Sequence, residues 1–325
     1  MRVLVTGGTG FVGAWTAKAV SDAGHDVRYL VRTPEKLATS AGALGLDTRD
    51  HVVGDITQAD SVREALTGCD AVVHCAAVVA FRPDAAEKMS RTNLAGARNV
   101  LGQAVELGLD PVVHVSSIAA VFDPRLSLLT ADLPVAPGLD DYGVSKAQVE
   151  TYARELQDDG APVVTTYPGM VLGPPAGTQT GEATEGIEKG IRMRLIPGRR
   201  AAWTVCDVRD LGRVHAATLE PGRGPRRYAA GGVRIGVREI TEALAEASGR
   251  RMLHVPVPDG VLRGFGRVQD RLGLRTPVTE SRMEYYTRMP EADNGPIERE
   301  LGVCFRPPRE TITDAVEGLR RLGRL

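Results

Sequence analysis

The stretch Thr6-Gly7-Gly8-Thr9-Gly10-Phe11-Val12-Gly13 decides the fold of this 325-residue chain. A short apolar run, Arg2–Thr6, leads into it, and a helical pattern follows it until Gly24. Glycines spaced G-x-G-x-x-G between a strand and a helix permit a tight turn, let the backbone approach a pyrophosphate and allow the helix to pack closely on the strand. The N-terminus of that helix adds unpaired N–H groups and the positive end of a dipole. The stretch therefore predicts a loop that binds the phosphates of a dinucleotide.

The overall composition is that of an ordinary globular protein. Hydrophobic residues make up 42% and charged residues 25% of the chain, which excludes the disordered, collagen-like and coiled-coil classes. The 40 Lys and Arg balance 41 Asp and Glu, so we expect no nucleic-acid partner. The four cysteines lack the spacing of a zinc site or a disulfide framework, so we expect no metal and a reducing, cytoplasmic location.

Short apolar runs alternate with helical patterns through the first half of the chain. Leu94, Ala97, Leu101 and Val105, for example, recur at three- and four-residue steps and form one apolar stripe that can pack on a sheet. Strands separated by helices of this length are joined by right-handed crossovers and lie parallel. The pattern predicts an α/β fold, a doubly wound parallel (Rossmann) sheet with ligands at the carboxyl ends of its strands. The expected strands are Arg2–Thr6, Asp26–Val31, His51–Val53, Ala71–Cys75, Pro111–Val115 and Val163–Tyr167.

The regular alternation of expected strands and helices ends near residue 170. A Pro- and Gly-rich stretch, Gly173–Gly181, begins a different pattern, although Trp203–Val208 and Arg227–Ala230 again resemble strands. The expected units are an NADP-binding domain, residues 1–170, rejoined by residues 199–235, and a smaller C-terminal substrate-binding lobe, residues 171–198 and 236–325.

The end of the second expected strand indicates which dinucleotide binds. An acidic residue there bonds the ribose 2′-hydroxyl of NAD, whereas an Arg suits the 2′-phosphate of NADP. Here the strand ends Leu30-Val31-Arg32-Thr33, and the nearby carboxylate, Asp26, sits at the opposite end of the strand. Arg32 therefore predicts NADP(H) rather than NAD. The alternative is a solvated Arg at the start of a surface helix.

A serine and a Tyr-x-x-x-Lys pair supply candidate catalytic groups. Tyr142 and Lys146 stand four residues apart at the start of an expected helix, so they are neighbours on one face. A tyrosine, with an ordinary pKa of about 10, acts near neutral pH only if positive charge such as a Lys ammonium lowers its pKa. Ser117, at the carboxyl end of the fifth expected strand, can donate a hydrogen bond to a substrate oxygen as charge develops on it. Taken alone, the Tyr and Lys could equally be an exposed helix pair.

The order of these motifs resembles the short-chain dehydrogenase/reductase superfamily. The chain length and the distinct C-terminal lobe resemble its extended branch, the epimerase/dehydratase type. The resemblance covers most of the first 210 residues. It implies that Tyr142 is the catalytic acid/base, that Lys146 binds the nicotinamide ribose and lowers the pKa of Tyr142, and that Ser117 polarises the substrate. Ser116 is the fallback if the register is shifted by one residue.

Further segments match the family's pattern. Gly54-Asp55-Ile56 follows the third strand, where the family's Asp meets the adenine, and Val73-His74-Cys75-Ala76-Ala77 lies beside the cofactor. Asn93 is at least as well explained by bonding to backbone at a helix start as by a proton-relay role. His74 and His114 are expected to be core histidines. The cofactor contacts that the resemblance implies are Gly7, Gly10, Phe11, Val12, Gly13, Arg32, Asp55, Ile56, Ala76, Ala77, Lys146, Pro168 and Val171.

The segment after the sixth strand separates groups within the branch. Sugar-nucleotide epimerases and dehydratases usually carry an Asn there, whereas Gly169-Met170-Val171-Leu172-Gly173-Pro174 has none. Together with Arg32, this is more similar to the dihydroflavonol reductase and 3β-hydroxysteroid dehydrogenase groups. The resemblance implies an NADP(H)-dependent oxidoreductase that moves a hydride between the nicotinamide and a ketone or secondary alcohol of a mid-sized, fairly apolar substrate. The alternatives are a nucleotide-sugar epimerase or dehydratase, and a non-catalytic NADP-binding regulatory protein.

The expected partners follow from the same observations. We expect a small-molecule substrate. The oligomeric state stays open, although a homodimer is a common habit of the family. No apolar run approaches the roughly 18 residues that span a bilayer, so we expect no membrane partner. The substrate's identity and the direction of reaction stay open, because specificity lies in the C-terminal lobe and in loops such as Ala119–Asp140.

Overall fold

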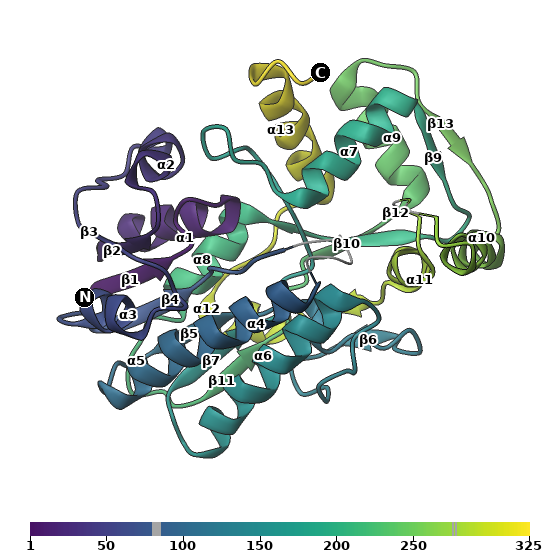
Figure 1. The fold of residues 1–325 in the computed structure, drawn as a ribbon. Helices are drawn as coiled ribbons and strands as arrows, with labels where there is room; N and C mark the ends of the chain where they lie inside the picture. The colour runs from purple at the N-terminus through teal and green to yellow at the C-terminus, as the bar shows by residue number, and fades with distance from the viewer. Residues whose placement is uncertain (80–85, 275, 277) are drawn as a thin grey trace.

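The computed structural model describes residues 1–79, 86–274, 276 and 278–325, and a seven-stranded sheet forms its centre (Figure 1). All neighbouring strands of this sheet run parallel. The prediction of an α/β fold with a doubly wound parallel sheet is therefore confirmed. In sheet order the strands are β11 (Arg226–Tyr228), β7 (Val163–Thr166), β5 (Val112–Val115), β4 (Ala71–His74), β1 (Arg2–Thr6), β2 (Asp26–Val31) and β3 (His51–Val53).

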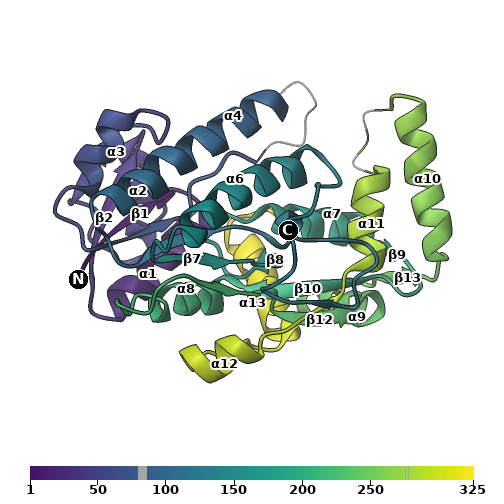
Figure 2. The same ribbon diagram turned by 90° about the horizontal axis from the view of Figure 1, so that it is seen from below.

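Helices cover both faces of this sheet, because apolar side chains point alternately to either face along its strands and both faces must be buried. Val3 and Val5 of β1 enter one buried cluster and Leu4 enters the other, because successive side chains of a strand point to opposite faces. The two layers are seen edge-on in Figure 2. One layer holds α1 (Phe11–Asp22), α8 (Val208–Ala217) and α12 (Gly295–Leu301), and the other holds α3 (Ala59–Leu66), α4 (Ala86–Ala97), the π-helical η3 (Arg98–Gly102), α5 (Gln103–Glu106) and α6 (Asp141–Asp158).

The chain after β7 builds a second, smaller sheet that the sequence did not separate from the first. The expected strand Trp203–Val208 exists as β10 (Ala202–Asp207), but it pairs with β8 and β12 and not with the large sheet. The expected strand Arg227–Ala230 exists as β11, which does join the large sheet beside β7. The other members of the small sheet are β8 (Met170–Leu172), parallel to β10, and β12 (Val233–Gly236), antiparallel to it.

Helices from three distant parts of the chain pack together around this small sheet. Ile187, Leu244 and Val316, one from each of three helices, belong to the same buried cluster. Two further helices, α10 and α11, lie at the right of Figure 1 beyond the small sheet. The remaining elements are α7 (Glu182–Met193), α9 (Val237–Ser248), α13 (Pro308–Arg321), α10 (Asp259–Arg271), α11 (Glu280–Arg288), α2 (Pro34–Thr39), η1 (Gly42–Leu44), η4 (Ile118–Ala120), and the short pairs β9 (Leu195–Pro197) with β13 (Leu253–Val255) and β6 (Leu128–Leu129) with β14 (Glu291–Ala292).

A buried set of charges ties the last part of the chain to the junction of β10 and α8. Asp207 accepts from Arg209 and from the hydroxyl of Thr311. Asp210 accepts the side chain and the backbone N–H of Arg306. Both carboxylates are buried, and removing one partner of such a pair leaves an uncompensated charge. These contacts therefore hold the segment before α13 against the core. Within the described residues, no helix has both the length and the apolar character needed to cross a membrane.

We predict that Gly13→Ala destabilises the fold and that Gly10→Ala does not. A Cβ on Gly13 would lie 2.2 Å from the carbonyl oxygen of Gly7, whereas a Cβ on Gly10 would meet the same oxygen at 3.4 Å, an ordinary contact. Forcing the helix away from the loop should lower the free energy of unfolding by about 1–3 kcal/mol. Urea unfolding of both variants measures this. Equal stability of the two variants would show that α1 can shift at no cost.

Candidate active site

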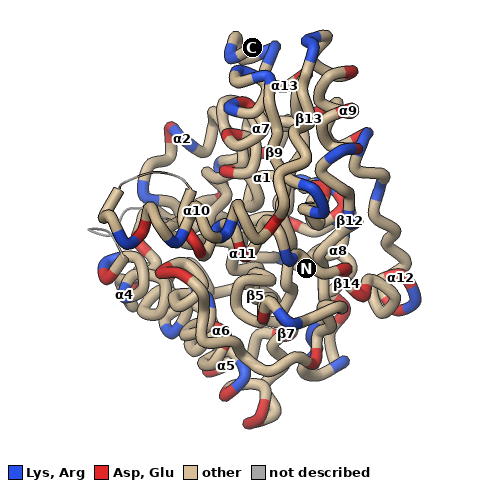
Figure 3. The backbone as a smooth tube through the Cα atoms, turned by 90° about the vertical axis from the view of Figure 1, so that its right-hand side faces the viewer, with Lys and Arg blue, Asp and Glu red and all other residues tan. Residues whose placement is uncertain are grey.

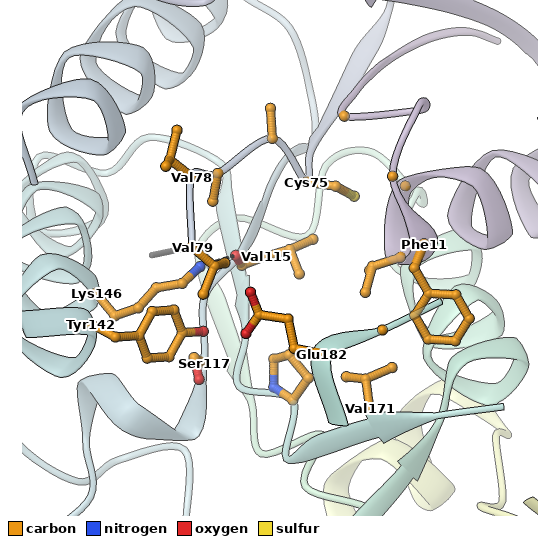
Figure 4. Close-up of a pocket in the computed structure, with 18 of the residues that line it drawn as sticks. Phe11, Cys75, Val78, Val79, Val115, Ser117, Tyr142, Lys146, Val171 and Glu182 are labelled. Carbon is orange, nitrogen blue, oxygen red and sulfur yellow. Dashed lines mark hydrogen bonds between the residues drawn. The ribbon is translucent and has the colours of Figure 1, made fainter. Parts of the chain in front are cut away.

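A pocket of about 730 Å³ opens at the carboxyl ends of β1, β2, β4 and β5 (Figure 4). The structure brings together in its lining every residue that the sequence singled out as a site residue. From one wall to the other these are Gly7, Gly10, Phe11, Val12, Gly13, Arg32, Asp55, Ile56, Ala76, Ala77, Ser117, Tyr142, Lys146, Pro168 and Val171.

The glycine loop forms one wall and leaves donors open toward the pocket. Gly7 has a φ of 77° and its missing Cβ would lie 2.8 Å from the backbone nitrogen of Ala76, so a side chain here has neither the conformation nor the space. Gly10 is the N-cap of α1 and supplies no side-chain cap. The first N–H groups of a helix have no partner within the helix. An unfilled helix start of this kind, lined by glycine, suits a phosphate group.

Arg32 and Asp55 stand together at the end of β2 and after β3. The Arg32 side chain is 74% exposed, and its Nη1 lies 3.7 Å from Oδ2 of Asp55, a distant ion pair. Asp55 also accepts from the backbone and the hydroxyl of Thr57. Burial opposes ionisation of Asp55, but the bonds from Thr57 and the charge of Arg32 outweigh it and lower its pKa. Asp55 is therefore an ionised acceptor, while the guanidinium of Arg32 keeps most of its donors open.

Asn93 of α4 has a structural task in this structure. Its Oδ1 accepts from the backbone N–H of Val78 at 2.7 Å, and its Nδ2 donates to the carbonyl of Val78 at 2.9 Å and to Oγ of Ser145 at 3.0 Å. The side chain thus clamps the pocket loop after β4 to the catalytic helix α6. Asn93 therefore bonds to backbone as interpreted, but from inside α4 and not from a helix start. Both N–H groups of its amide are engaged, which leaves no free donor for a proton relay.

The histidines of β4 and β5 are buried in the sheet behind the pocket. His74 bonds through Nδ1 to the hydroxyl of Thr6 at 2.8 Å. The ring of His114 stacks on that of His74 with centroids 6.3 Å apart, and neither of its nitrogens has a partner among the described residues. Burial lowers the pKa of His74 to about 3 and also lowers that of His114, with Lys146 adding to both effects. Both rings are therefore neutral, as expected of core histidines.

Tyr142 and Ser117 face one another across the floor of the pocket (Figure 4). Asp140 caps the start of α6 by accepting from the backbone N–H of Gly143 at 2.8 Å, which places Tyr142 in the first turn. Ser117 lies two residues after β5, at the N-cap of η4, and accepts from the backbone N–H of Ala119. Burial raises the pKa of Tyr142 to about 12, with a hydrogen bond with Ser117 opposing this. The protein by itself therefore keeps the tyrosine protonated, so Lys146 alone does not produce the lowered pKa of Tyr142 that the sequence analysis expected.

Lys146 lies one helical turn further along α6 and is only 8% exposed. Its Nζ donates to the carbonyls of Val115 and Ser116, each at 3.3 Å, and stands 6.0 Å from the centre of the Tyr142 ring. Burial lowers the pKa of Lys146 to about 8, so the ammonium is mostly protonated at neutral pH. Ser116 and Ser117 both line the pocket. The hydroxyl of Ser116 has no partner within the described part of the chain, whereas Ser117 hydrogen-bonds with Tyr142.

The opposite wall comes from residues that the sequence analysis missed. Glu182, in the first turn of α7, points its carboxylate into the space before Tyr142 (Figure 4). Arg282, Tyr285 and Met289 of the α11 region line the same wall. Burial, reinforced by Glu185 and opposed by Arg282, raises the pKa of Glu182 to about 7. No motif marks these residues, because they come from segments far from the glycine loop and meet it only through tertiary packing.

The fold and the site together define a class of protein. A doubly wound parallel sheet, a glycine loop at the start of α1, and a Ser, Tyr and Lys at the carboxyl ends of the central strands are the parts of a nicotinamide-dependent dehydrogenase of the extended short-chain type. The profile of the NAD dependent epimerase/dehydratase family matches residues 3–231. The chain belongs to this family, and it is an NAD(P)-dependent enzyme.

Relatives in other organisms cover nearly the whole chain. The chain is 27% identical to sterol demethylase protein B of Methylococcus capsulatus over 99% of both chains. It is 27% identical to a Synechocystis protein assigned as a dihydroflavonol 4-reductase, over 98% of this chain and 94% of that one. It is 28% identical to a 3 beta-hydroxysteroid dehydrogenase/Delta 5-->4-isomerase of Mycobacterium tuberculosis, over 86% and 79%. These findings confirm the resemblance on which the sequence analysis relied.

Solved structures share the fold over its full length. The crystal structure of gox2253 superposes with a TM-score of 0.83 at 26% identity and covers 100% of this chain and 99% of its own. The named reductases and dehydrogenases among the relatives support a nicotinamide-dependent oxidoreductase or epimerase.

We predict that Glu182→Gln changes how stability depends on pH. A carboxyl whose pKa is raised from 4.5 to about 7 in the folded protein costs no stability below pH 4.5, and stability is lost as the pH rises through 7. The Gln variant lacks this loss, so its melting temperature relative to that of the wild type should be higher at pH 8 than at pH 5. Glu239→Gln, an exposed acid in the first turn of α9, serves as the control and should show no such difference. A Glu182→Gln variant that tracks the wild type at both pH values would contradict the raised pKa.

Proposed function

We propose that the protein is an NADP(H)-dependent oxidoreductase that transfers a hydride between the nicotinamide and a ketone or secondary alcohol of a mid-sized, fairly apolar substrate. The observation that carries the proposal is the convergence of Ser117, Tyr142 and Lys146 on one pocket with the glycine loop. The substrate half of that pocket is lined largely by apolar groups, among them Val79, Ile118 and Met289. The relatives named as acting on sterols, steroids and dihydroflavonols support the same class of substrate.

The residues present fit a nicotinamide dinucleotide. The missing Cβ atoms at Gly7 and Gly13 let the loop and α1 lie close together, and the uncapped start of α1 offers N–H groups to a pyrophosphate. Asp55 would meet the adenine end, and Ala76 and Ala77 would line the channel toward Lys146. The open guanidinium of Arg32 would pair with a 2′-phosphate, with Thr33 or Lys36 assisting. This last contact is the basis for proposing NADP(H) rather than NAD.

The chain's own residues carry the proton chemistry. When bound, the nicotinamide supplies or accepts the hydride. Tyr142, which burial keeps protonated, donates its proton to the substrate oxygen as that oxygen gains negative charge. Ser117 donates a hydrogen bond to the same oxygen. The ammonium of Lys146 stabilises the tyrosinate left behind and would hold the ribose of the nicotinamide.

The family also supports an epimerase or dehydratase as a second candidate. Such an enzyme returns the hydride to the substrate and shows no net turnover of cofactor. The two candidates therefore separate in one measurement, the steady consumption of NADPH with a panel of ketones. A binding protein without catalysis would neither consume NADPH nor convert a substrate. The presence of both Tyr142 and Lys146 speaks against this third possibility.

We predict that Tyr142→Phe lowers the turnover of NADPH with the best ketone of the panel by about 100-fold or more, because the general acid is lost. Its affinity for NADPH should stay unchanged, since the hydroxyl meets the reacting oxygen and not the pyrophosphate. Lys146→Met should harm both binding and turnover. Tyr152→Phe, on the same helix but outside the pocket lining, is the matched control. If the Tyr142→Phe variant keeps more than a tenth of the wild-type activity, Tyr142 is not the acid.

We predict that the wild type binds NADP about tenfold or more tightly than NAD, because charge-assisted hydrogen bonds contribute about 1.5–3 kcal/mol each. Arg32→Asp should reverse this preference, since it removes the donors and repels a 2′-phosphate. Titration of both cofactors into both proteins measures the ratio, with Arg49→Asp as an exposed control outside the pocket. A wild type that prefers NAD would make Arg32 an ordinary solvated arginine.

A further inference from the structure

Helix α10 presents its large apolar side chains to solvent rather than to the protein. Val261, Phe265, Val268 and Leu272 are between 51% and 67% exposed. They follow one another at steps of four, three and four residues, so they share one face of the helix. Leu274, just beyond the end of the helix, is 49% exposed. We call the set Val261, Phe265, Val268 and Leu272 the outer stripe.

The side of α10 that faces the protein carries Leu262 together with glycine and polar residues. A Cβ on Gly266 would lie 2.7 Å from the backbone of Thr279, so the helix approaches the start of α11 closely. Gln269 is buried and accepts a hydrogen bond from the hydroxyl of Thr276. Arg263 and Arg267 pair with Glu284 and Glu280 of α11. A surface helix normally turns its apolar face to the protein and its polar face to solvent. The outer stripe has the opposite orientation, which suits contact with something outside the chain.

Outside the ion pairs, three guanidinium groups and two carboxylates of the described residues surround the outer stripe, an excess of one positive charge. Asp259 is engaged by the backbone N–H groups of Arg199 and Arg200, and Asp270 by the backbone N–H of Glu280. The guanidinium groups of Arg199 and Arg200, near the start of α10, and of Arg271, at its end, form no ion pair among the described residues. In Figure 3 α10 crosses the face toward the viewer, with both basic and acidic positions coloured along it. An apolar stripe with arginines at its borders matches an anionic lipid surface.

The size of the outer stripe also favours a lipid surface over a second copy of the chain. Four side chains exposed to about half of their area offer on the order of 400 Å². A stable protein interface needs about 800 Å² from each partner, whereas a helix can lie in a bilayer interface with only its apolar face inserted. The sequence led us to expect no membrane partner because no segment could span a bilayer, but a helix that lies on the surface needs no such segment.

We propose that α10 docks the protein onto anionic membrane surfaces through the outer stripe. Helix α11 lies between α10 and the pocket. Its residues Glu280, Glu284 and Thr287 contact α10, whereas Arg282 and Tyr285, on the other side, line the pocket. Docking therefore holds the substrate half of the pocket next to the bilayer, where apolar substrates collect. That consequence rests on the proposed function, but the docking itself does not.

Flotation of the full chain with vesicles tests the proposal. Vesicles of phosphatidylcholine mixed with phosphatidylglycerol should carry the wild type, and vesicles of phosphatidylcholine alone should carry much less. Phe265→Asp should lower the partition coefficient about tenfold or more, because it puts a charge where an aromatic ring inserts. Leu107→Asp, at an exposed leucine on the C-cap of α5, is the matched control and should float like the wild type. Melting temperature and NADPH affinity check that the Phe265→Asp variant is folded.

The other outcomes overturn the proposal in distinguishable ways. A wild type that floats with neither kind of vesicle, or a Phe265→Asp variant that floats like the wild type, removes the outer stripe as a lipid site. A wild-type dimer in light scattering that Phe265→Asp converts to monomer assigns the stripe to a second copy instead. Each of these results leaves the consumption of NADPH untouched, so failure of the docking does not count against the proposed reaction.

Discussion

The contact between the backbone of Gly7 and the first turn of α1 is the constraint on which the rest of the site depends. The carbonyl of Gly7 occupies the space that a Cβ of Gly13 would need, and the amide of Ala76 occupies the space that a Cβ of Gly7 would need. Because no side chain intervenes, the ends of β1 and β4 and the start of α1 meet at one point. Any other residue would push the helix outward and close the place where a pyrophosphate can lie.

Burial shifts the pKa values of Tyr142 and Lys146, both on α6, in opposite directions. It raises the pKa of Tyr142 to about 12 and lowers that of Lys146 to about 8, because a site that excludes water disfavours every charged form. Both shifts favour the neutral form, and neither ionises the tyrosine near neutral pH. In the proposed reaction, the same exclusion of water would strengthen hydrogen bonds from Ser117 and Tyr142 to the substrate oxygen.

The substrate wall is assembled from parts that are far apart in the chain. Glu182 comes from α7, and Arg282 and Tyr285 come from α11. Both helices pack on the buried cluster around the small sheet, α7 through Ile187 and Ile191 and α11 through Tyr286. The cofactor side of the pocket, by contrast, is built from consecutive strand ends of one sheet. This difference explains why one side follows a family pattern and the other does not.

The sequence by itself determined the parallel sheet and the cofactor side of the pocket. Three strands have the expected bounds: Arg2–Thr6, Asp26–Val31 and His51–Val53. Strand bounds can be read from the sequence because the spacing of apolar residues and the position of turn residues are local properties. Parallel strands joined by right-handed crossovers must then bring their carboxyl ends to one edge of the sheet. Only the tertiary structure decided that β10 belongs to a second sheet, that Glu182 faces Tyr142, and that the apolar face of α10 points outward. Each of these depends on packing between separate elements of the chain, where many arrangements satisfy the same local pattern and only the complete core selects one.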